Sequence, residues 1–368
     1  MNSCTKREMI VGLICIGLYC MISCTPKEKR AGMNDKELLG KQIFFDETLS
    51  EPMGESCATC HTPEKGFADK YSRITSEGAV KGRFSNRNSM TCSYAAYVPA
   101  LYYDEEEETF VGGLFWDGRV NSLEEQAAQP FVNPLEMGNE SNERVVEKIR
   151  KAAYYPELIK LYGETTSSDS IFSYVLDALA TYERSVEVNP FTSKYDAWED
   201  GKYKFTKQEK EGLKLFKEKG LCAECHILEK DERAGRVLFT DHTYDNLGIP
   251  SNPENPYFNV QPPYNTCGRD TIDMGLGAFL QDSAEYGKFR VPTLRNIVLT
   301  APYGHNGYFK TLEEIVHFYN VRDVEDYPVP EYAETVNKDE LGNLKLSEQE
   351  EAVIVAFLHT LTDGYLPD

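Results

Sequence analysis

Apolar residues recur at helical spacing in several parts of the chain. Residues 35–45 and 206–216 follow this pattern, and Thr206 with Glu209 three residues later is the signature of a helix start. An amphipathic helix is predicted at residues 171–186, and Asn189-Pro190 stops the pattern because the residue before a proline avoids helical conformation. Further helices are predicted at residues 122–129, 143–151, 312–319 and 347–361.

Strand signals are few and short, and long connections that contain proline and glycine, such as residues 246–270, join the helices. Such connections fit a fold whose core is partly supplied by a cofactor. We therefore predict a mainly α protein with long irregular loops. At 368 residues the chain exceeds what one hydrophobic core usually serves, so two domains are expected, with the polar stretch that ends at Lys204 as the linker.

The composition is that of a globular protein with an acidic surface. Hydrophobic residues make up 41% of the chain and there is no low-complexity tract, which excludes a disordered chain. The formal net charge is -21, and a surface of that charge repels the phosphates of nucleic acid. The charge suits solubility, or the docking of a partner with a basic face.

The first two dozen residues have the pattern of an export signal. Lys6 and Arg7 precede an apolar run at residues 9–22, which is too short for a membrane-spanning helix. Ser23-Cys24 follows, as in a bacterial lipobox. We predict a lipoprotein signal peptide at residues 1–23 and a lipid anchor at Cys24, which would hold the protein at the periplasmic face of a membrane. The alternative is an ordinary signal that is cleaved elsewhere.

The ten cysteines divide into groups with different expected roles. Three lie in the signal, Cys24 is the predicted anchor, and four form two Cys-x-x-Cys pairs. Cys92 and Cys267 remain. In an oxidising compartment they could form a disulfide, and two buried free thiols are the alternative.

Each Cys-x-x-Cys pair is followed directly by histidine. The motifs are Cys57-Ala58-Thr59-Cys60-His61 and Cys222-Ala223-Glu224-Cys225-His226, and Cys-x-x-Cys-His is the attachment signature of c-type haem. A thiol redox motif or half of a zinc site are the alternatives, but a zinc ribbon would need a closer second pair. We predict two covalent haems with His61 and His226 as iron ligands, one in each of two cytochrome c-like domains at residues 24–190 and 191–368.

The ligand on the other face of each iron separates electron transfer from catalysis. The chain has six histidines, and none lies between His61 and His226. The first haem therefore lacks a local histidine for its second axial position. An open iron is a place where a small oxidant can bind, which argues against a pure electron carrier with two six-coordinate haems.

Six segments follow one another in a specific order along the chain: residues 115–119, 123–127, 133–138, 245–250, 289–296 and 300–307. Together they resemble the bacterial dihaem cytochrome c peroxidases and their relatives in the MauG family. The resemblance implies that Trp116 lies between the haems and that Gln126 and Glu136 line the distal pocket of the first, or peroxidatic, haem. A carboxylate beside an amide also suits peroxide cleavage, which needs a proton moved from one oxygen to the other.

The second, electron-transfer haem departs from the ordinary peroxidase pattern. In the peroxidases a methionine ligates this iron, and the matching position here is Tyr319, which is a tyrosine ligand in MauG-like proteins. A phenolate stabilises higher-valent iron, whereas a thioether stabilises ferrous iron. Met274 is the rival ligand.

A calcium ion between the domains is a further feature that the resemblance implies. Asn88, Thr300 and Pro302 match its protein ligands, and oxygen atoms are what this hard cation binds. Two local departures are Met90, where the family usually has proline, and an acidic insertion at residues 97–113.

The predicted function is that of a periplasmic dihaem peroxidase. It would reduce hydrogen peroxide with electrons from a small cytochrome c or a cupredoxin. The alternatives are a MauG-like enzyme that oxidises side chains of a partner protein, a non-catalytic dihaem electron carrier, and a structural zinc module. The sequence leaves open whether the chain forms a homodimer.

Overall fold

Both Cys-x-x-Cys-His motifs follow the helices that the sequence predicts before them. Helix α1 spans Asp35–Phe44 and helix α8 spans Lys207–Lys217. Thr206 caps α8 together with Glu209, as predicted, and Asn34 with Glu37 forms the same reciprocal cap on α1. These caps fix the residue at which each helix begins.

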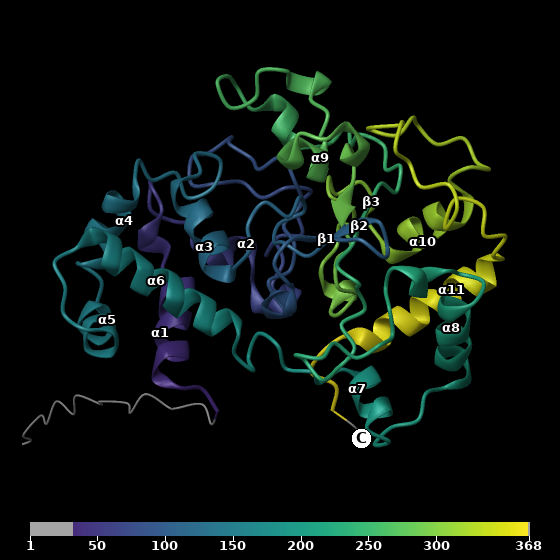
Figure 1. The fold of residues 1–368 in the computed structure, drawn as a ribbon, viewed down its shortest axis with the longest axis horizontal. Coiled ribbons are helices and arrows are strands. Elements are labelled where there is room, and N and C mark those ends of the chain that lie inside the picture. Colours follow the sequence, from purple (N-terminus) through teal and green to yellow (C-terminus); the bar gives the residue numbers. More distant parts are fainter. Residues whose placement is uncertain (1–31, 367–368) are drawn as a thin grey trace, which may run out of the picture. The chain divides into compact units, whose positions relative to one another are not determined.

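The computed structural model describes residues 32–366, and residues 33 onward form one compact unit (Figure 1). The predicted signal peptide and Cys24 lie outside the described residues. Among the helices that are described, none is long and apolar enough to span a membrane. The mainly α fold is confirmed. Its other helices are α2 (Cys57–Cys60), α3 (Leu123–Val132), α4 (Asn142–Ile149), α5 (Tyr155–Tyr162), α6 (Ser168–Glu183), α7 (Lys194–Glu199), α9 (Gly275–Leu280), α10 (Leu312–Val321) and α11 (Glu348–Leu358).

The sequence pattern missed α2, α5, α7 and α9, and α7 corrects the predicted linker. This helix lies inside the stretch that was expected to be irregular. Ser193 and Asp196 form a capping box at its start, and Trp198 stacks on Phe205 with ring centroids 4.7 Å apart. The Asp196 carboxylate also pairs with the buried Arg295 guanidinium at 2.9 Å. The stretch therefore packs into the second half of the protein and is not a free linker.

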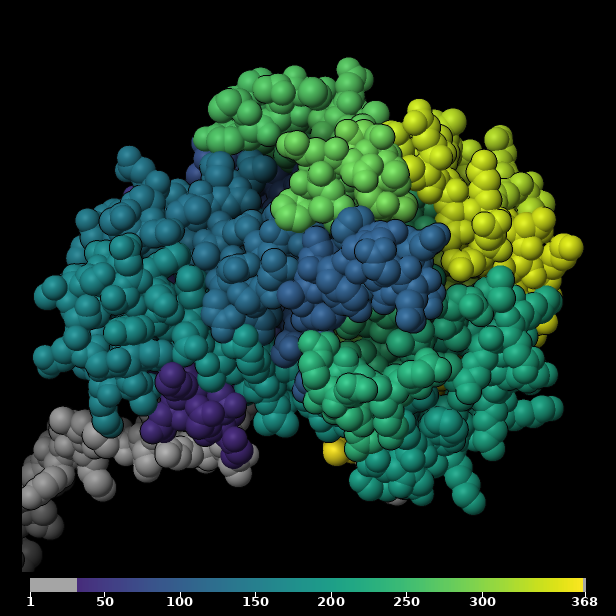
Figure 2. All heavy atoms as spheres, in the orientation of Figure 1, coloured from purple at the N-terminus to yellow at the C-terminus, as the bar shows by residue number. Residues whose placement is uncertain are grey.

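Strands are few, as expected. The predicted acidic insertion contains an antiparallel hairpin of β1 (Tyr102–Asp104) and β2 (Thr109–Val111). Strands β3 (Tyr244–Asp245) and β4 (Phe289–Arg290) form a second antiparallel pair, and β2 lies against β3. Figure 2 shows the insertion as the blue surface between segments of the first and second halves.

Two separate clusters of buried apolar side chains form the main cores. One contains residues between Met33 and Val188, and the other contains residues between Tyr195 and Leu361. The clusters lie on opposite sides of the predicted boundary at residue 190. That each of them belongs to a cytochrome c-like domain built around a haem stays a prediction.

A glycine sets the closest helix contact in each core. Helix α1 packs on α6, and α8 packs on α11 (Figure 1). A Cβ atom at Gly40 would lie 1.9 Å from the Ala178 carbonyl oxygen, and one at Gly212 would lie 2.0 Å from that of Val353. The two halves thus use the same device, since only glycine permits this approach of two backbones.

The two remaining cysteines correct an expectation. Cys92 is buried, Cys267 is exposed, and both are free thiols. Of the two alternatives that the sequence left open, the disulfide is not formed, and a buried free thiol is found only for Cys92.

Candidate functional site

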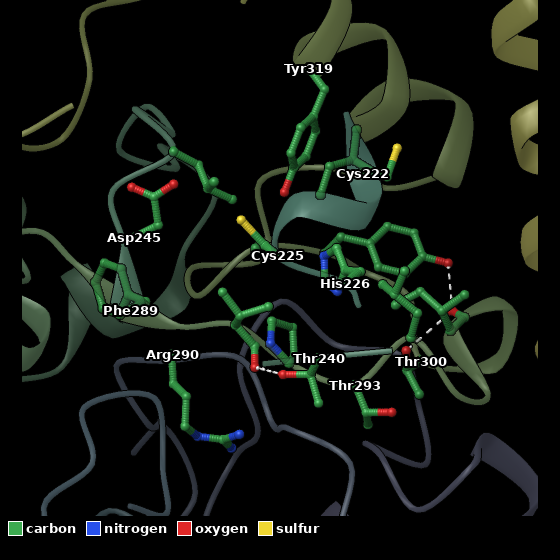
Figure 3. Close-up of a pocket in the computed structure, with 18 of the residues that line it drawn as sticks. Cys222, Cys225, His226, Thr240, Asp245, Phe289, Arg290, Thr293, Thr300 and Tyr319 are labelled. Atoms are coloured by element: carbon green, nitrogen blue, oxygen red, sulfur yellow. Dashed lines mark hydrogen bonds between the residues drawn. The ribbon is translucent and has the colours of Figure 1, made fainter. Parts of the chain in front are cut away.

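The second attachment motif opens onto a large cavity that is lined by residues of both halves. Cys222–Glu224 forms a single 3-10 turn, and Cys222, Cys225 and His226 line a cavity of about 220 Å³ (Figure 3). A haem attached to the two thiols needs such a space beside them, so the cavity fits the predicted group. Its apolar lining includes Phe216, Leu238, Leu294, Ile354 and Leu358.

Both motif histidines are oriented by a backbone carbonyl. Nδ1 of His61 lies 3.2 Å from the Phe67 carbonyl oxygen, and Nδ1 of His226 lies 2.9 Å from that of Phe239. With Nδ1 as the donor, Nε2 keeps its lone pair for a metal ion. Burial lowers the pKa of His61 and lowers that of His226 to about 4, so both rings are neutral at working pH, as an iron ligand must be.

The four motif cysteines are free and half-buried. Burial raises the pKa of Cys57 and Cys225, and raises that of Cys60 and Cys222 to about 12. Such thiols stay protonated at neutral pH, because the apolar surroundings disfavour the thiolate. A disulfide-exchange role, which needs a reactive thiolate, is disfavoured, whereas thioether attachment to a bound haem is consistent with these positions.

The two rival ligands of the second haem line different cavities. Tyr319 lies on α10, and its ring points into the cavity that holds Cys222, Cys225 and His226 (Figure 3). Met274 lines a separate cavity of about 180 Å³. Burial raises the pKa of Tyr319, so its phenol ionises only with strong assistance. The geometry favours Tyr319 over Met274, and the ligation itself stays a prediction.

Trp116 connects the two halves. Its ring lines the same cavity as His226, and its Nε1 donates to the Asn88 carbonyl oxygen at 2.9 Å. The ring packs edge-on against Phe289, with centroids 6.4 Å apart. The Trp116 carbonyl accepts the Arg290 backbone N–H at 2.9 Å. These contacts fix the indole at the border of the halves, which is where a role between two haems requires it.

Glu136 lies beside the first attachment motif. Its charge acts on the thiols of Cys57 and Cys60, which places the carboxyl near the expected position of the first haem. Burial raises the pKa of Glu136, while the Arg119 guanidinium and hydrogen bonds to nearby polar side chains act in the opposite direction. A carboxyl with a raised pKa and a cation nearby suits proton transfer near neutral pH.

Gln126 lies half-buried on α3, and within the described residues no hydrogen bond joins its side chain to Glu136. Its predicted role therefore rests on the resemblance alone.

The three predicted calcium ligands line one cavity. Asn88, Thr300 and Pro302 all line the cavity that contains Trp116 and His226. Asn88 is buried, and its Nδ2 donates to the Ile74 carbonyl at 3.1 Å, which orients its amide. Oxygen atoms of these residues are of the kind that calcium binds. Calcium itself stays a prediction.

Two charged residues near the first motif were not predicted. The Arg119 guanidinium carbon lies 3.6 Å from the centre of the Phe115 ring, and its charge acts to lower the pKa of Glu136. Nothing in the sequence around Arg119 indicated this role. Glu183 is buried near Cys57, and burial raises its pKa to about 8. Its signal was present in the sequence, since Glu183 occupies an apolar-face position of the helix, four residues after Leu179.

Comparison with known proteins agrees with this arrangement. The family model of di-haem cytochrome c peroxidases matches residues 34–204. The methylamine utilization protein MauG of Paracoccus denitrificans is 36% identical over 361 residues, which cover 92% of this chain and 91% of that protein. This chain belongs to the di-haem cytochrome c peroxidase and MauG family. The cytochrome c551 peroxidase of Nitrosomonas europaea is 32% identical over 336 residues, which cover 91% of this chain and 81% of that protein.

Solved structures place the chain in the same family. The diheme peroxidase BthA from Burkholderia thailandensis has a TM-score of 0.77 at 31% identity, over 90% of this chain and 87% of that one. A MauG-like protein associated with microbial copper homeostasis has a TM-score of 0.69 at 28% identity, over 90% of this chain and 91% of that one. Family membership implies two c-type haems and a peroxidase-type oxidoreductase. Both peroxidases and MauG proteins are among its relatives, so family membership alone does not distinguish between the two reactions.

Proposed function

We propose that this protein is a periplasmic cytochrome c peroxidase. It reduces hydrogen peroxide to water with two electrons, which arrive singly from a small cytochrome c or a cupredoxin, and with two protons. The observation that carries the proposal is the half-buried Glu136 carboxyl, whose charge acts on the Cys57 and Cys60 thiols, in a half whose only histidine is His61. The export signal and the lipid anchor at Cys24 are part of the proposal and place the protein at the periplasmic face of a membrane.

The chain would hold its two haems through the motif residues. Cys57 and Cys60 bind the first haem, with His61 as its iron ligand, and the second motif binds the other haem in the same way. When bound, haem iron supplies the redox centre at which a peroxide can be reduced. In the first half no second histidine competes with peroxide for that centre.

Glu136 is the group that moves the protons. It accepts a proton from the near oxygen of peroxide and delivers it to the far oxygen, which leaves as water. Burial raises the pKa of Glu136, which favours its protonated form, and the Arg119 guanidinium acts in the opposite direction and favours the carboxylate. Gln126 would hold the peroxide through its amide.

Trp116 is the proposed electron relay between the halves. An indole held by a hydrogen bond to Asn88 and packed against Phe289 keeps one geometry, and a fixed geometry supports a reproducible transfer rate. A calcium ion held by Asn88, Thr300 and Pro302 would stiffen the same wall. Asn88 thus joins the proposed ion to the relay.

A MauG-like reaction is the second candidate, and Tyr319 favours it. Its phenol lines the cavity that contains His226, whereas Met274 lines the separate cavity. An anionic oxygen ligand would make higher oxidation states accessible at the second haem, and these could be used to oxidise side chains of a partner protein.

The test is a peroxide assay on the holoprotein with a reduced small cytochrome as donor. Glu136→Gln should retain both haems and lose turnover by about 10²–10⁴-fold, which is typical for a general acid–base group. Glu140→Gln is the matched control, because Glu140 is an exposed carboxylate in the same segment. Equal turnover in the two variants would remove Glu136 from the reaction.

Ferric-state spectra accompany the assay. The first haem should give a high-spin electron paramagnetic resonance signal in the resting protein, because His61 has no partner histidine in its half. Two purely low-spin signals and no turnover would instead identify an electron carrier.

A further inference from the structure

Arg290 is a buried cation that has no carboxylate partner among the residues that the structure describes. The structure describes three buried arginines, and Arg295 and Arg322 each form an ion pair with a carboxylate. Arg290 is 6% exposed, and within the described residues it pairs with no carboxylate. Its Nε donates to the Phe115 carbonyl at 3.2 Å, and its Nη2 lies 3.8 Å from the Met90 sulfur. A buried charge without a partner is strongly unfavourable, so this position calls for an anion.

His242 is unsatisfied in the same region. It is 7% exposed, and neither ring nitrogen has a hydrogen-bond partner. Its φ of 63° lies in the left-handed region, and Gly112 N–H holds this conformation by donating to the His242 carbonyl at 2.9 Å. Burial, with the charge of nearby Arg290, lowers the pKa of His242 to about 3. The ring is therefore neutral, with one N–H free to donate.

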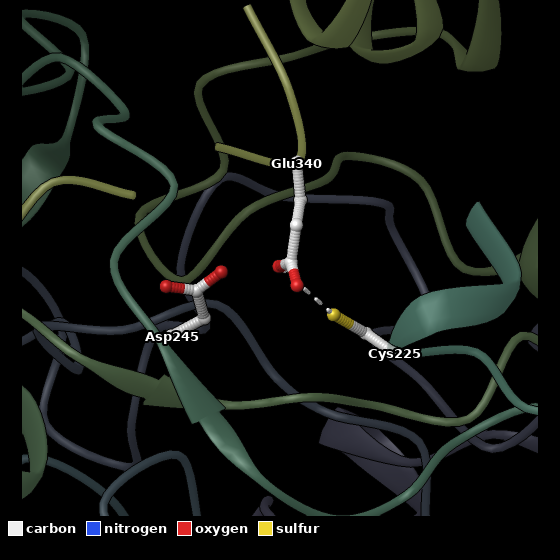
Figure 4. A group of neighbouring side chains, drawn as sticks. All are labelled: Cys225, Asp245 and Glu340. Carbon is white, nitrogen blue, oxygen red and sulfur yellow. Dashed lines mark hydrogen bonds between the residues drawn. The ribbon is translucent and has the colours of Figure 1, made fainter. Parts of the chain in front are cut away.

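Both residues line the cavity that contains Cys222, Cys225 and His226. Acidic groups lie beside Cys225, where the ligand atoms of Asp245, Glu340 and Cys225 are within 4.8 Å of one another (Figure 4). Strand register separates Asp245 from the arginine. Asp245 pairs with Phe289 and Tyr244 pairs with Arg290, so Asp245 and Arg290 point to opposite faces of the β3–β4 pair. The cavity has an acidic edge at Cys225 and a basic edge at Arg290.

We propose that Arg290, with His242 beside it, binds the propionate carboxylates of the haem attached at Cys222 and Cys225. The inference rests on the proposed function only for the presence of that haem. The cysteines fix its vinyl edge next to Asp245 and Glu340, which repel carboxylates. The propionates are the anions that the haem brings, and a guanidinium binds a carboxylate through two parallel hydrogen bonds.

This assignment gives Arg290 a second role. Its backbone N–H donates to the Trp116 carbonyl at 2.9 Å, and its side chain donates to the Phe115 carbonyl, so the same residue would tie the second haem to the segment of the proposed relay. Its positive charge also favours ferrous over ferric iron. Arg290 therefore opposes the effect that a Tyr319 phenolate would have on the second haem.

The experiment is a redox titration of the holoprotein without peroxide. A unit charge about 10 Å from the iron, at an effective dielectric constant of about 20, changes a one-electron equilibrium by about tenfold. Arg290→Gln should therefore raise the ferric-to-ferrous ratio of the second haem about tenfold at a fixed applied potential. Arg290→Lys keeps the charge and should retain most of the wild-type ratio. Arg233→Gln is the matched control, because it removes an arginine that is 47% exposed and paired with Asp231.

Resonance Raman bands of the propionate groups provide a second readout. This readout does not require that Arg290→Gln is stable. Both Arg290→Lys and His242→Gln should shift these bands, because each changes a direct hydrogen bond. Unshifted bands in both variants, or an unchanged redox ratio in Arg290→Gln with both haems attached, would overturn the assignment. Failure of the peroxidase proposal is distinguishable, since lost or absent turnover leaves both readouts intact. A chain that carries no covalent haem refutes the proposed function and this inference together.

Discussion

Replacement of Tyr319 by phenylalanine tests which atom ligates the second haem. The ring stays in α10 and only the hydroxyl is lost, so the packing of the cavity wall is preserved. An ordinary phenol has a pKa of about 10, and keeping it ionised at pH 7 costs about 4 kcal/mol. Burial raises the pKa of Tyr319 further, so the cost here is greater. Ferric iron is the Lewis acid that would supply this free energy.

The assay is the ferric-state electron paramagnetic resonance spectrum of the holoprotein. Tyr319→Phe should abolish the low-spin signal of the second haem, or replace it by that of a new ligand. The wild-type signal should not change between pH 6 and pH 9, roughly, because a bound phenolate has no proton to release. Tyr303→Phe is the matched control, since Tyr303 lines the same cavity but donates to the Ile297 carbonyl at 2.9 Å. Met274→Leu should also leave the signal unchanged.

One result would refute this reasoning. If Tyr319→Phe keeps the low-spin signal and Met274→Leu loses it, Met274 ligates the second haem. The segment around Met274 must then move into the cavity that contains His226 when haem binds. The MauG-like candidate then fails, and the ordinary peroxidase gains, with a high-potential second haem as the point of electron entry.

Three further predictions concern the frame around the haems. A calcium chelator should slow electron transfer between the haems in stopped-flow measurements, and active protein without calcium by metal analysis would exclude the ion. Gly40→Ala and Gly212→Ala should each lower the free energy of unfolding by at least about 1–3 kcal/mol, because the new methyl group meets a backbone carbonyl; an unchanged urea midpoint would contradict the close helix contact. Against the effect of burial, Arg87 lowers the pKa of Asp273 to about 2, so the pair should stabilise the protein above about pH 4 and lose this effect as the pH falls to 2. Arg87→Gln should reduce that acid dependence, and an identical acid-unfolding curve would rule the pair out.

Local sequence was sufficient for much of the fold. Helices α1 and α8 were predicted because apolar spacing and capping residues act within a few positions of each other. The two attachment motifs were readable for the same reason, since five adjacent residues carry the whole chemistry of attachment. Helix α7 was missed because its six residues are too few to show a period, and its packing against Arg295 depends on a segment almost one hundred residues away.

The tertiary structure decided what the spacing of residues along the chain could not. The family resemblance favoured Tyr319 and left Met274 as its rival, and only the folded chain places the two in different cavities. Cys92 and Cys267 were a candidate pair until one proved buried and the other exposed. Arg290 lies in one of the segments that carry the family resemblance, but nothing in the sequence marked it as a binding residue. Its importance comes from burial without a carboxylate partner, and the free energy of a charge depends on all the groups around it, whichever part of the chain supplies them.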